Sequence, residues 1–288
     1  MSGFQLTFGK FQLDLGTRAC IMGILNVTPD SFSDGGRFHD YNAAVAQGIH
    51  LAEQGAHILD IGGESTRPFS KPVSTREEID RVVPVIETLS KKISIPISID
   101  TVKAPVAEAA LHAGAAIIND ISAFEMDPDM VGVAARYQVP VILMHMKGTP
   151  ETMQNDPVYD DLMQEISDYL AVRAGDLIAG GVEKSRIILD PGIGFGKTVH
   201  HNLQLIKCLE TIVELGFPVL MGPSRKSFIR NILSKDAPKI PLDTPEQIEN
   251  GTLAAVGACL AHGAHIIRVH DVQRTVAFTR IYDAIRNA

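Results

Sequence analysis

The sequence predicts a single α/β barrel in which eight parallel strands alternate with helices, a (β/α)8 or TIM barrel. Apolar, β-rich runs alternate strictly with segments of helical periodicity, the order typical of parallel strands joined by right-handed crossovers. Runs such as 140–144 and 187–190 are apolar on both faces, as in a sheet covered by helices. The 288 residues, with 45% hydrophobic content, fit one barrel domain over 1–288. An open doubly wound sheet is the alternative, because alternation alone does not prove closure.

Each expected element can be placed by its residues. The strands are expected at 20–26, 57–62, 95–100, 115–120, 139–145, 186–190, 217–222 and 264–270. The helices are expected near 41–54, 76–91, 103–113, 129–137, 158–180, 199–215, 226–234 and 246–262, with another at 273–286. We therefore expect a ring of helices around the strands.

The first 16 residues follow a different pattern. Residues 4–8 and 11–15 alternate apolar and polar side chains, and Gly9 and Lys10 lie between them as a tight turn. This alternation predicts a β-hairpin over residues 1–16. We expect the hairpin to cover the N-terminal end, or bottom, of the barrel.

Composition and charge argue against several classes of protein. No apolar run reaches the roughly 18 residues that span a bilayer, and no basic segment precedes an apolar one at the N-terminus, so we expect a soluble, cytoplasmic protein without a membrane partner. Cys20, Cys208 and Cys259 are odd in number and widely spaced, which favours free thiols over disulfides or a metal cluster. The net charge of -8, without a basic stripe, argues against a nucleic-acid partner.

Polar side chains stand at the carboxyl end of every expected strand. In a parallel barrel these ends converge to form the active site. The residues are Asn26, Glu64, Ser65, Thr66, Arg67, Asp100, Asn119, Asp120, His145, Asp190, Ser224, Arg225, Lys226, Arg268 and His270. A single residue of this kind, such as Asp100, is explained as well by capping of the next helix. Their coincidence at all the strands favours a functional site.

These polar residues form two sets. Asp100, Asn119 and Asp190 end apolar strands, where a carboxylate is costly to bury unless it meets a donor-rich group, so they indicate a ligand rich in N–H groups. The second set suits phosphate oxygens. Its members are Asn26, Thr66, Arg67, Ser224, Lys226, Arg268 and His270. Together the sets predict a compact polar heterocycle carrying a phosphate or diphosphate, although Arg268 could instead pair with Asp271 or with a carboxylate below the barrel.

The glycine-rich segment 190–198 looks at first like a phosphate-binding P-loop, because it ends in Gly-Lys-Thr. That motif requires four residues between its glycines, whereas Gly192 and Gly196 are separated by three. An NTPase is therefore not expected. The glycines are better explained as letting the backbone turn sharply under a flat ring, with Phe195 placed to stack on it.

Seven motifs in this order resemble those of the dihydropteroate synthases. They are Met22–Gly36, Asp60–Pro68, Ile99–Thr101, Ile118–Ser122, Asp190–Lys197, Ser224–Ser227 and Ile267–Asp271. The match runs nearly end to end, and the ordered set is far more specific than any one motif. The resemblance implies a transferase of folate biosynthesis that joins 6-hydroxymethyl-7,8-dihydropterin diphosphate to 4-aminobenzoate, giving 7,8-dihydropteroate and diphosphate.

The resemblance also implies roles for individual residues. The pterin would be bound by Asp100, Asn119, Ile121, Met144, Asp190, Phe195 and Lys226. The diphosphate would be held by Asn26, Thr66, Arg268 and His270, with Asn26 also a ligand of Mg²⁺. The 4-aminobenzoate site would be formed by Phe32, Thr66, Arg67, Pro68 and Ser227. The implied catalytic residues are Asn26, Thr66, Arg67, Lys226, Arg268 and His270, and the implied assembly is a homodimer.

Three other classes share part of this pattern. A pterin-dependent methyltransferase domain would share Asp100, Asn119 and Asp190 but would not need the diphosphate set. A barrel aldolase would use Lys226 as a Schiff-base nucleophile, which requires a desolvated lysine, whereas Lys226 follows Arg225 at the start of a helix. A non-catalytic pterin-binding protein would keep the motifs without turnover.

Two segments have the composition of mobile loops. Val27–Tyr41 is rich in Ser, Thr, Asp and Gly, and Gly63–Thr75 contains serines and prolines. A polar surface turn is the simpler explanation for the first segment. We expect both loops to be poorly ordered when the site is empty and to close over the diphosphate and the arylamine.

Overall fold

Eight parallel strands form one sheet in the computed structural model, which describes residues 3–28, 37–65, 72–235 and 243–288. The strands are β3 (Cys20–Asn26), β4 (Ile58–Gly62), β5 (Ile97–Asp100), β6 (Ile117–Asp120), β7 (Val141–Met144), β8 (Ile187–Asp190), β9 (Leu220–Met221) and β10 (Ile266–Val269). Their order in the sheet is β8-β7-β6-β5-β4-β3-β10-β9. A parallel bridge between Leu189 and Val219 joins the two ends of this order, so the sheet curls into a barrel. The barrel prediction is confirmed and the open-sheet alternative is wrong.

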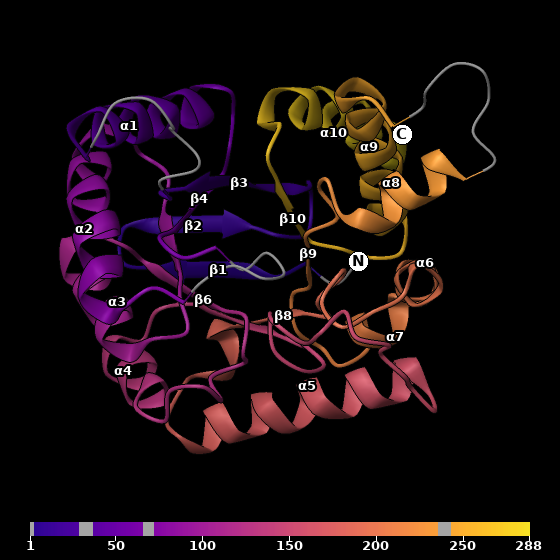
Figure 1. Cartoon of the computed structure of the whole chain (residues 1–288), viewed down its shortest axis with the longest axis horizontal. Coiled ribbons are helices and arrows are strands. Elements are labelled where there is room, and N and C mark those ends of the chain that lie inside the picture. The colour runs from indigo at the N-terminus through magenta and orange to yellow at the C-terminus, as the bar shows by residue number, and fades with distance from the viewer. Residues whose placement is uncertain (1–2, 29–36, 66–71, 236–242) are drawn as a thin grey trace.

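Helices surround the strands (Figure 1). They are α1 (Arg37–Glu53), α2 (Thr75–Lys92), α3 (Ala104–Ala113), α4 (Met130–Tyr137), α5 (Leu162–Ala179), α6 (Val199–Lys207), α7 (Glu210–Val213), α8 (Ser227–Ser234), α9 (Pro245–Ala261) and α10 (Val272–Arg286). Several begin at the residue types expected of an N-cap: Ser74, Asp161 and Thr244 each accept a hydrogen bond from a backbone N–H of the first turn.

Three helices differ most from the sequence prediction, and one of them is α5, which begins at Leu162 rather than near 158. Helix α1 begins at Arg37, so the expected loop 27–41 is shorter at its C-terminal end. The single helix expected at 199–215 is two helices, α6 and α7, because the helix is interrupted at Cys208 and Leu209. Leu209 is fully buried and its backbone N–H bonds to Ile206 rather than one residue further back, so the chain turns inward at this point.

The N-terminal hairpin covers the bottom of the barrel, as predicted. Strands β1 (Gln5–Phe8) and β2 (Phe11–Asp14) pair antiparallel. The buried hairpin residues are Leu6, Phe8, Leu13 and Leu15, and the barrel residues in the same apolar cluster are Cys20, Met22, Ile58, Ile117, Ile142, Ile188, Leu220 and Ile266. These barrel residues lie at or near the starts of their strands, so the hairpin closes the N-terminal end with apolar contacts.

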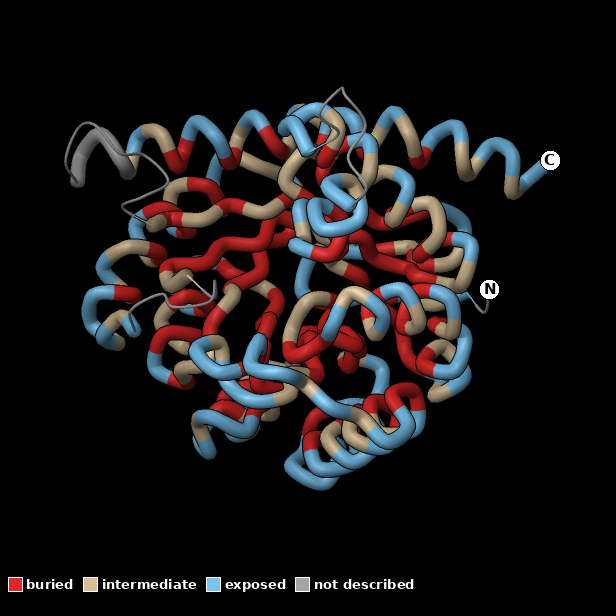
Figure 2. The backbone as a smooth tube through the Cα atoms, turned by 45° about the vertical axis from the view of Figure 1, so that its right-hand side comes forward, coloured by how far each residue is buried: buried red, intermediate tan, exposed pale blue. Residues whose placement is uncertain are grey.

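Side-chain alternation separates the barrel into two environments. Residues such as Ile61, Ile99 and Leu189 point outward and pack with the helices in a second, larger apolar cluster. The alternate positions point inward, and beyond the apolar bottom layer these become polar, beginning with Asp60 and Asn119. Figure 2 shows the buried strands at the centre and exposed residues on the outer turns of the helices. Asp60 and Asn119 thus lie beyond the apolar bottom layer, on the side of the barrel interior toward the carboxyl ends of the strands.

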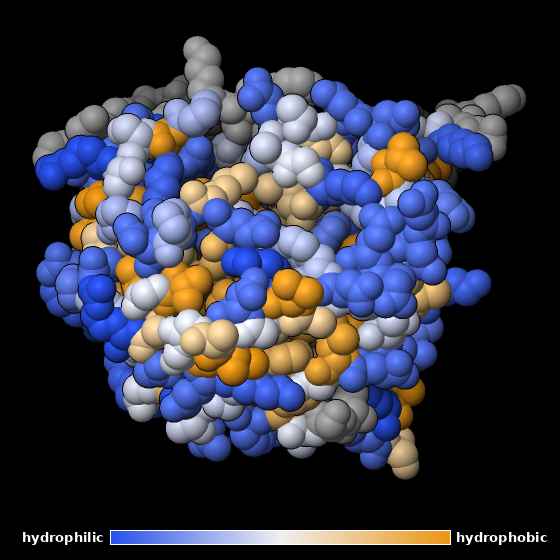
Figure 3. Space-filling view, turned by 90° about the horizontal axis from the view of Figure 1, so that it is seen from below, coloured by the Kyte–Doolittle hydropathy of each residue, from blue (hydrophilic) through white to orange (hydrophobic). Residues whose placement is uncertain are grey.

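The surface is mixed in character. On the face shown in Figure 3, hydrophobic patches are small and are separated by hydrophilic side chains. No described helix has the length and apolar content needed to cross a membrane. Within the described ranges the three cysteines are free thiols, as predicted, with Cys20 and Cys259 buried.

The hairpin should contribute strongly to stability. We expect Leu6→Ala to lower the free energy of unfolding by about 2–5 kcal/mol, because it removes a side chain buried between the hairpin and the barrel. The neighbouring Thr7→Ala, at an exposed position of the same strand, should change it by less than about 0.5 kcal/mol. Urea unfolding of both variants measures this difference, and equal effects would contradict the role of the hairpin.

Candidate active site

A buried ion-pair network crosses the barrel interior at the carboxyl end of its strands. Arg268, on β10, donates from Nε to Asp60 Oδ2 at 2.6 Å and from Nη2 to Asp100 Oδ2 at 2.7 Å. Asn119 Nδ2 donates to the same Asp60 oxygen at 3.1 Å. Asp60 is fully buried, so its charge depends on these two donors. The network joins strands β4, β5, β6 and β10 across the barrel.

The network changes the interpretation of Arg268 and Asp100. The sequence placed Arg268 with the phosphate-binding residues and Asp100 with the ring-binding residues, whereas the structure joins them in one ion pair. Burial raises the pKa of Asp100 to about 7 although Arg268 opposes the shift, and the carboxylates of Asp60 and Asp100 hold the pKa of Arg268 above its ordinary value against burial. Neither alternative named for Arg268 is what the structure shows, because its partners Asp60 and Asp100 lie inside the barrel rather than below it, and Asp271 caps α10.

Asp60 is one of the residues that the sequence interpretation missed. It stands inside a quoted motif but was given no role, because it lies mid-strand in the apolar run Ile58–Gly62. The signal was present, since a lone carboxylate in a strand that is otherwise apolar must find a partner. Alternation along the strand also places Asp60 and Gly62 on the inward face.

Asp190 ends β8 and begins the glycine-rich segment. It is buried, and its Oδ1 accepts a hydrogen bond from the backbone N–H of Gly192 at 2.7 Å. Gly192 has φ of 71°, and a Cβ there would lie 1.8 Å from the carbonyl oxygen of His145, so only glycine fits. Gly196 likewise has positive φ and passes close to Lys147. The predicted sharp turns are therefore confirmed, while a ring above them stays a prediction.

Lys226 and Phe195 meet at the rim of this segment. Lys226 Nζ lies 3.8 Å from the centroid of the Phe195 ring, a cation–π contact. Burial, reinforced by the nearby Arg268, lowers the pKa of Lys226 to about 8. Lys226 is half-buried and packs against Gly194 and Phe195, whereas its neighbour Arg225 is exposed, adopts a left-handed conformation and pairs with Glu249.

Ser224, His270 and Ser227 lie near the ends of β9 and β10. Ser224 Oγ and His270 Nδ1 are 2.9 Å apart, and the backbone N–H of His270 also donates to Ser224 Oγ at 3.2 Å. Ser227 is exposed and is the first residue of helix α8. This arrangement joins two members of the predicted phosphate set, Ser224 and His270, directly. It places Ser227, which was predicted for the 4-aminobenzoate site, at a helix N-terminus, where backbone N–H groups favour anions.

Ile121, Met144 and a buried lysine complete the interior. Ile121 and Met144 are buried at the ends of β6 and β7, as apolar walls of a ring pocket require. Lys197, which the sequence interpretation left without a role, is buried with Nζ 3.0 Å from His145 Nδ1 and 3.0 Å from the carbonyl oxygen of Phe195. Burial lowers the pKa of Lys197 to about 7. Lys197 therefore links the glycine-rich segment, at Phe195, to His145 after the end of β7.

Four predicted residues, Phe32, Thr66, Arg67 and Pro68, lie outside the described residues, as do the central parts of both predicted loops. Asn26 is described, and it ends β3 in register with Gly62, which is itself in register with Asp100. The amide of Asn26 thus stands at the same end of the barrel as the buried network.

The described residues fit Mg²⁺ only as an ion bound mainly by its substrate. They contain no group of three or more His, Cys, Asp or Glu side chains arranged to hold a metal. Asn26 offers one amide oxygen at the strand end, and a hard cation with one protein ligand would take further oxygens from phosphate and water. This donor set suits Mg²⁺ that arrives with a diphosphate.

A parallel barrel with buried polar groups at the carboxyl ends of its strands is the architecture of a barrel enzyme, and the comparisons identify the class as pterin-binding enzymes. Residues 22–270 match the family described as pterin binding enzyme. The chain is 46% identical over 280 residues to the dihydropteroate synthase of Synechocystis sp., covering 97% of this chain and 94% of the relative. It is 46% identical over 273 residues to that of Bacillus subtilis, covering 94% and 90%. The chain therefore belongs to the dihydropteroate synthase family, whose members are transferases.

Solved structures support the same assignment. The dihydropteroate synthase of Xanthomonas albilineans with 4-aminobenzoic acid superposes with a TM-score of 0.90 at 42% identity and covers 100% of both chains. The complex of that enzyme with 7,8-dihydropteroate gives a TM-score of 0.86 at 41% identity, with 99% of both chains covered. These are enzymes rather than passive pterin-binding proteins, and they are neither aldolases nor methyltransferases.

Asp190 should make stability depend on pH. Burial raises its pKa from 3.8 to about 6, so between these values the folded state binds a proton that the unfolded chain has released, and stability falls as pH rises through this window. Asp190→Asn should therefore gain stability relative to the parent from about pH 4 to 6, by up to about 3 kcal/mol. Urea unfolding across this range tests it, with exposed Asp129→Asn as control. A difference that does not change with pH would contradict the assignment.

Proposed function

We propose that this chain is a dihydropteroate synthase, which joins 6-hydroxymethyl-7,8-dihydropterin diphosphate to 4-aminobenzoate and releases diphosphate in folate biosynthesis. The observation that carries the proposal is identity of about half the residues to such synthases over nearly the whole chain, combined with buried carboxylate and amide groups at the strand ends. A pterin-dependent methyltransferase is the alternative, but the relatives named above do not favour it.

The buried groups suit the pterin ring. Asp190 is the best partner for the guanidine-like edge of the ring, since one carboxylate can accept two N–H donors. Asn119 and Asp100 would complete the polar contacts, and Lys226 would donate to the ring carbonyl. Ile121, Met144 and Phe195 would enclose the flat faces. Lys226 would then exchange its contact with the Phe195 ring for one with the ligand.

The leaving diphosphate would lie at the outer side of the network. Asn26, Thr66 and His270 are proposed to hold its oxygens, His270 from the Ser224 contact that orients its ring. Arg268 is proposed to serve chiefly through Asp60 and Asp100, with its positive charge facing the departing group. Mg²⁺ held by Asn26 and the diphosphate would supply charge neutralisation to the leaving group.

The chemistry follows from this distribution of charge. The bond between the pterin methylene carbon and the diphosphate oxygen breaks, and diphosphate keeps the electron pair. The resulting cation is delocalised over the ring and stabilised by the buried carboxylates. The neutral amine of 4-aminobenzoate then forms the carbon–nitrogen bond and loses a proton, so no strong general base is required. Phe32, Thr66, Arg67, Pro68 and Ser227 are proposed to hold the arylamine.

The cellular setting is also part of the proposal. The chain is proposed to act as one domain over 1–288, because the hairpin and barrel share an apolar cluster. A cytoplasmic location is supported by buried free thiols, Cys20 and Cys259. A homodimer is proposed from the family resemblance, and sedimentation of the purified protein tests it.

Turnover with the two named substrates tests the function directly. We expect 7,8-dihydropteroate and diphosphate in equal amounts, detected by chromatography and a phosphate-release assay. Omission of 4-aminobenzoate should abolish the coupled product. Absence of product with folded protein and Mg²⁺ present would reject the proposal, whereas methyl transfer from a methylated pterin would favour the alternative.

Asn26 provides a test of the metal. Asn26→Ala should lower Mg²⁺-dependent turnover by about tenfold or more, because it removes the protein's oxygen ligand. It should leave the affinity for a pterin without diphosphate within about twofold, since that ligand makes no use of the ion. Calorimetry measures the affinity and a Mg²⁺ titration the turnover. Full activity of the parent in excess chelator would refute the role of the metal.

A further inference from the structure

Gly194 is held at both of its backbone polar groups by side chains that come from outside the glycine-rich segment. Its N–H donates to Asn202 Oδ1 at 2.7 Å, and its carbonyl oxygen accepts a hydrogen bond from Gln154 Nε2 at 2.9 Å. Asn202 is buried in α6, whereas Gln154 lies in the connection between β7 and α5. Two separate elements of the fold therefore fix the position of one glycine.

The other end of the Asn202 side chain serves the same segment. Its Nδ2 donates to the carbonyl oxygens of Thr198 at 2.8 Å and Lys197 at 3.3 Å. Asn202 is only 2% exposed, so loss of its amide would leave the N–H of Gly194 without this acceptor. An amide that accepts at one end and donates at the other thus ties α6 to the turn that precedes it.

Gly194 forms part of the surface on which the Lys226 side chain lies. Its φ is 83°, and a Cβ at this position would lie 2.8 Å from Lys226 Cδ and 3.3 Å from Lys226 Cε. The aliphatic part of the lysine therefore packs directly on the backbone of Gly194. Beyond it, Lys226 Nζ lies over the ring of Phe195, the next residue along the chain. The position of residues 194 and 195 thus sets the direction in which Lys226 points.

The same turn also leads back to Asp190. The N–H of Phe195 donates to the carbonyl oxygen of Gly192 at 3.0 Å, and the N–H of Gly192 donates to Asp190 Oδ1 at 2.7 Å. Asp190 is therefore fixed by contacts within the turn. Lys226 comes from a different strand end, so its position relative to Asp190 depends on where the turn is held by Asn202 and Gln154.

We propose that Asn202 and Gln154 are positioning residues for Lys226, acting through Gly194 to hold the lysine where its ammonium group can donate to the pterin. This inference rests on the proposed function, because the pterin is the ligand that Lys226 would contact. Neither residue touches a reacting atom. Loss of either hydrogen bond should shift Gly194, move Lys226 and weaken pterin binding.

NMR of the lysine side chain tests the positioning without any ligand. Lys226 Nζ lies 3.8 Å from the centroid of the Phe195 ring, so the ring current should displace the resonance of the adjoining Cε protons upfield. In protein with lysine isotopically labelled at Cε, this signal is identified by its loss in Lys226→Arg. It should move toward the ordinary lysine position in Asn202→Ala and in Gln154→Ala. An unmoved signal in either variant would overturn the role of that residue.

Calorimetry with 6-hydroxymethyl-7,8-dihydropterin, which lacks the diphosphate, tests the consequence for binding. We expect the Kd to rise about fivefold in Asn202→Ala and about threefold in Gln154→Ala, because each variant loses one hydrogen bond that places the lysine. Gln154 is exposed, so its substitution leaves the core intact even if Asn202→Ala lowers stability. A moved lysine signal with an unchanged Kd in both variants would overturn the link to the pterin.

Matched controls make the same changes at exposed positions. Asn250→Ala on α9 and Gln164→Ala on α5 remove side chains that bond to Gln247 and Asp168. Both should leave the lysine signal in place and the Kd within about twofold of the parent.

Gln154→Glu isolates the hydrogen bond itself. It keeps the length of the side chain, but a carboxylate cannot donate to the Gly194 carbonyl oxygen, so this variant should match Gln154→Ala. A Gln154→Glu variant with the parent's signal and Kd would contradict the proposal.

Lys226→Met separates failure of this inference from failure of the proposed function. If Lys226 donates to the pterin, Lys226→Met should raise the Kd at least as much as Asn202→Ala does. A Kd equal to the parent's would reject the proposed role of Lys226 in pterin binding and, with it, the link from Asn202 and Gln154 to the ligand. The lysine signal would still decide whether these two residues position Lys226.

Discussion

The buried pairing of Arg268 with Asp60 and Asp100 is the interaction on which the site depends. It brings two carboxylates and a guanidinium into the interior of a barrel whose bottom half is apolar. None of these charges would be stable there alone, so each fixes the position of the others. Asn119 joins through Asp60, and the polar groups of four strands become one unit. A ligand that enters meets preorganised acceptors rather than side chains that must still be arranged.

The glycine-rich segment depends on a second constraint, which is the close approach of its backbone to the neighbouring strand end. Its backbone passes so close to the carbonyl oxygen of His145 that a Cβ at Gly192 would overlap it. That close approach brings Asp190, Phe195 and the buried Lys197 to one side of the barrel mouth. The resemblance to a P-loop is therefore accidental. Here glycine serves close packing and positive φ, whereas in a P-loop it serves contacts between the backbone and phosphate.

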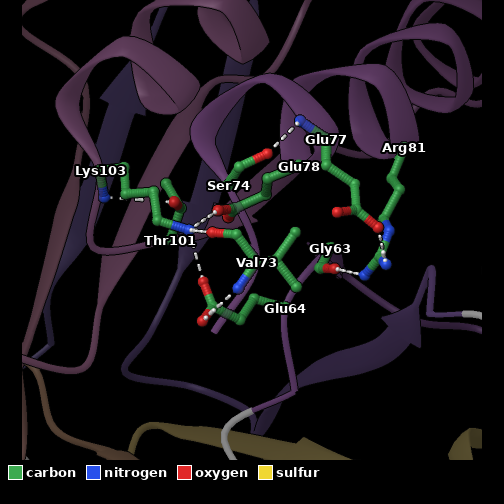
Figure 4. A network of polar contacts seen from close by, with 9 residues as sticks. All are labelled: Gly63, Glu64, Val73, Ser74, Glu77, Glu78, Arg81, Thr101 and Lys103. Carbon is green, nitrogen blue, oxygen red and sulfur yellow. Dashed lines mark hydrogen bonds and ion pairs between the residues drawn. The ribbon is translucent and has the colours of Figure 1, made fainter. Parts of the chain in front are cut away.

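The two sides of the site are built differently. On the side predicted to bind the ring, the polar groups come from strand ends and from a tightly packed turn. Beside these groups, Lys103 donates to Glu64 and to the carbonyl oxygen of Val73, and so holds together the two described ends of the connection after β4 (Figure 4). The β5–α3 connection carries both Asp100 and Lys103, so it links the two sides through a few residues.

The sequence by itself determined the barrel, its hairpin and the strand ends at which polar residues would gather, because these follow from short-range periodicity and from the geometry of parallel strands. It also determined the family, through seven ordered motifs. Only the tertiary structure decided which polar groups pair. Asp60 and Arg268 are 208 residues apart, and no local pattern links them. The contact of Lys226 with the Phe195 ring could not be predicted from its neighbours in the sequence, because the two residues come from different strand ends. Pairing and burial are properties of the closed barrel, and they arise only when distant strands meet.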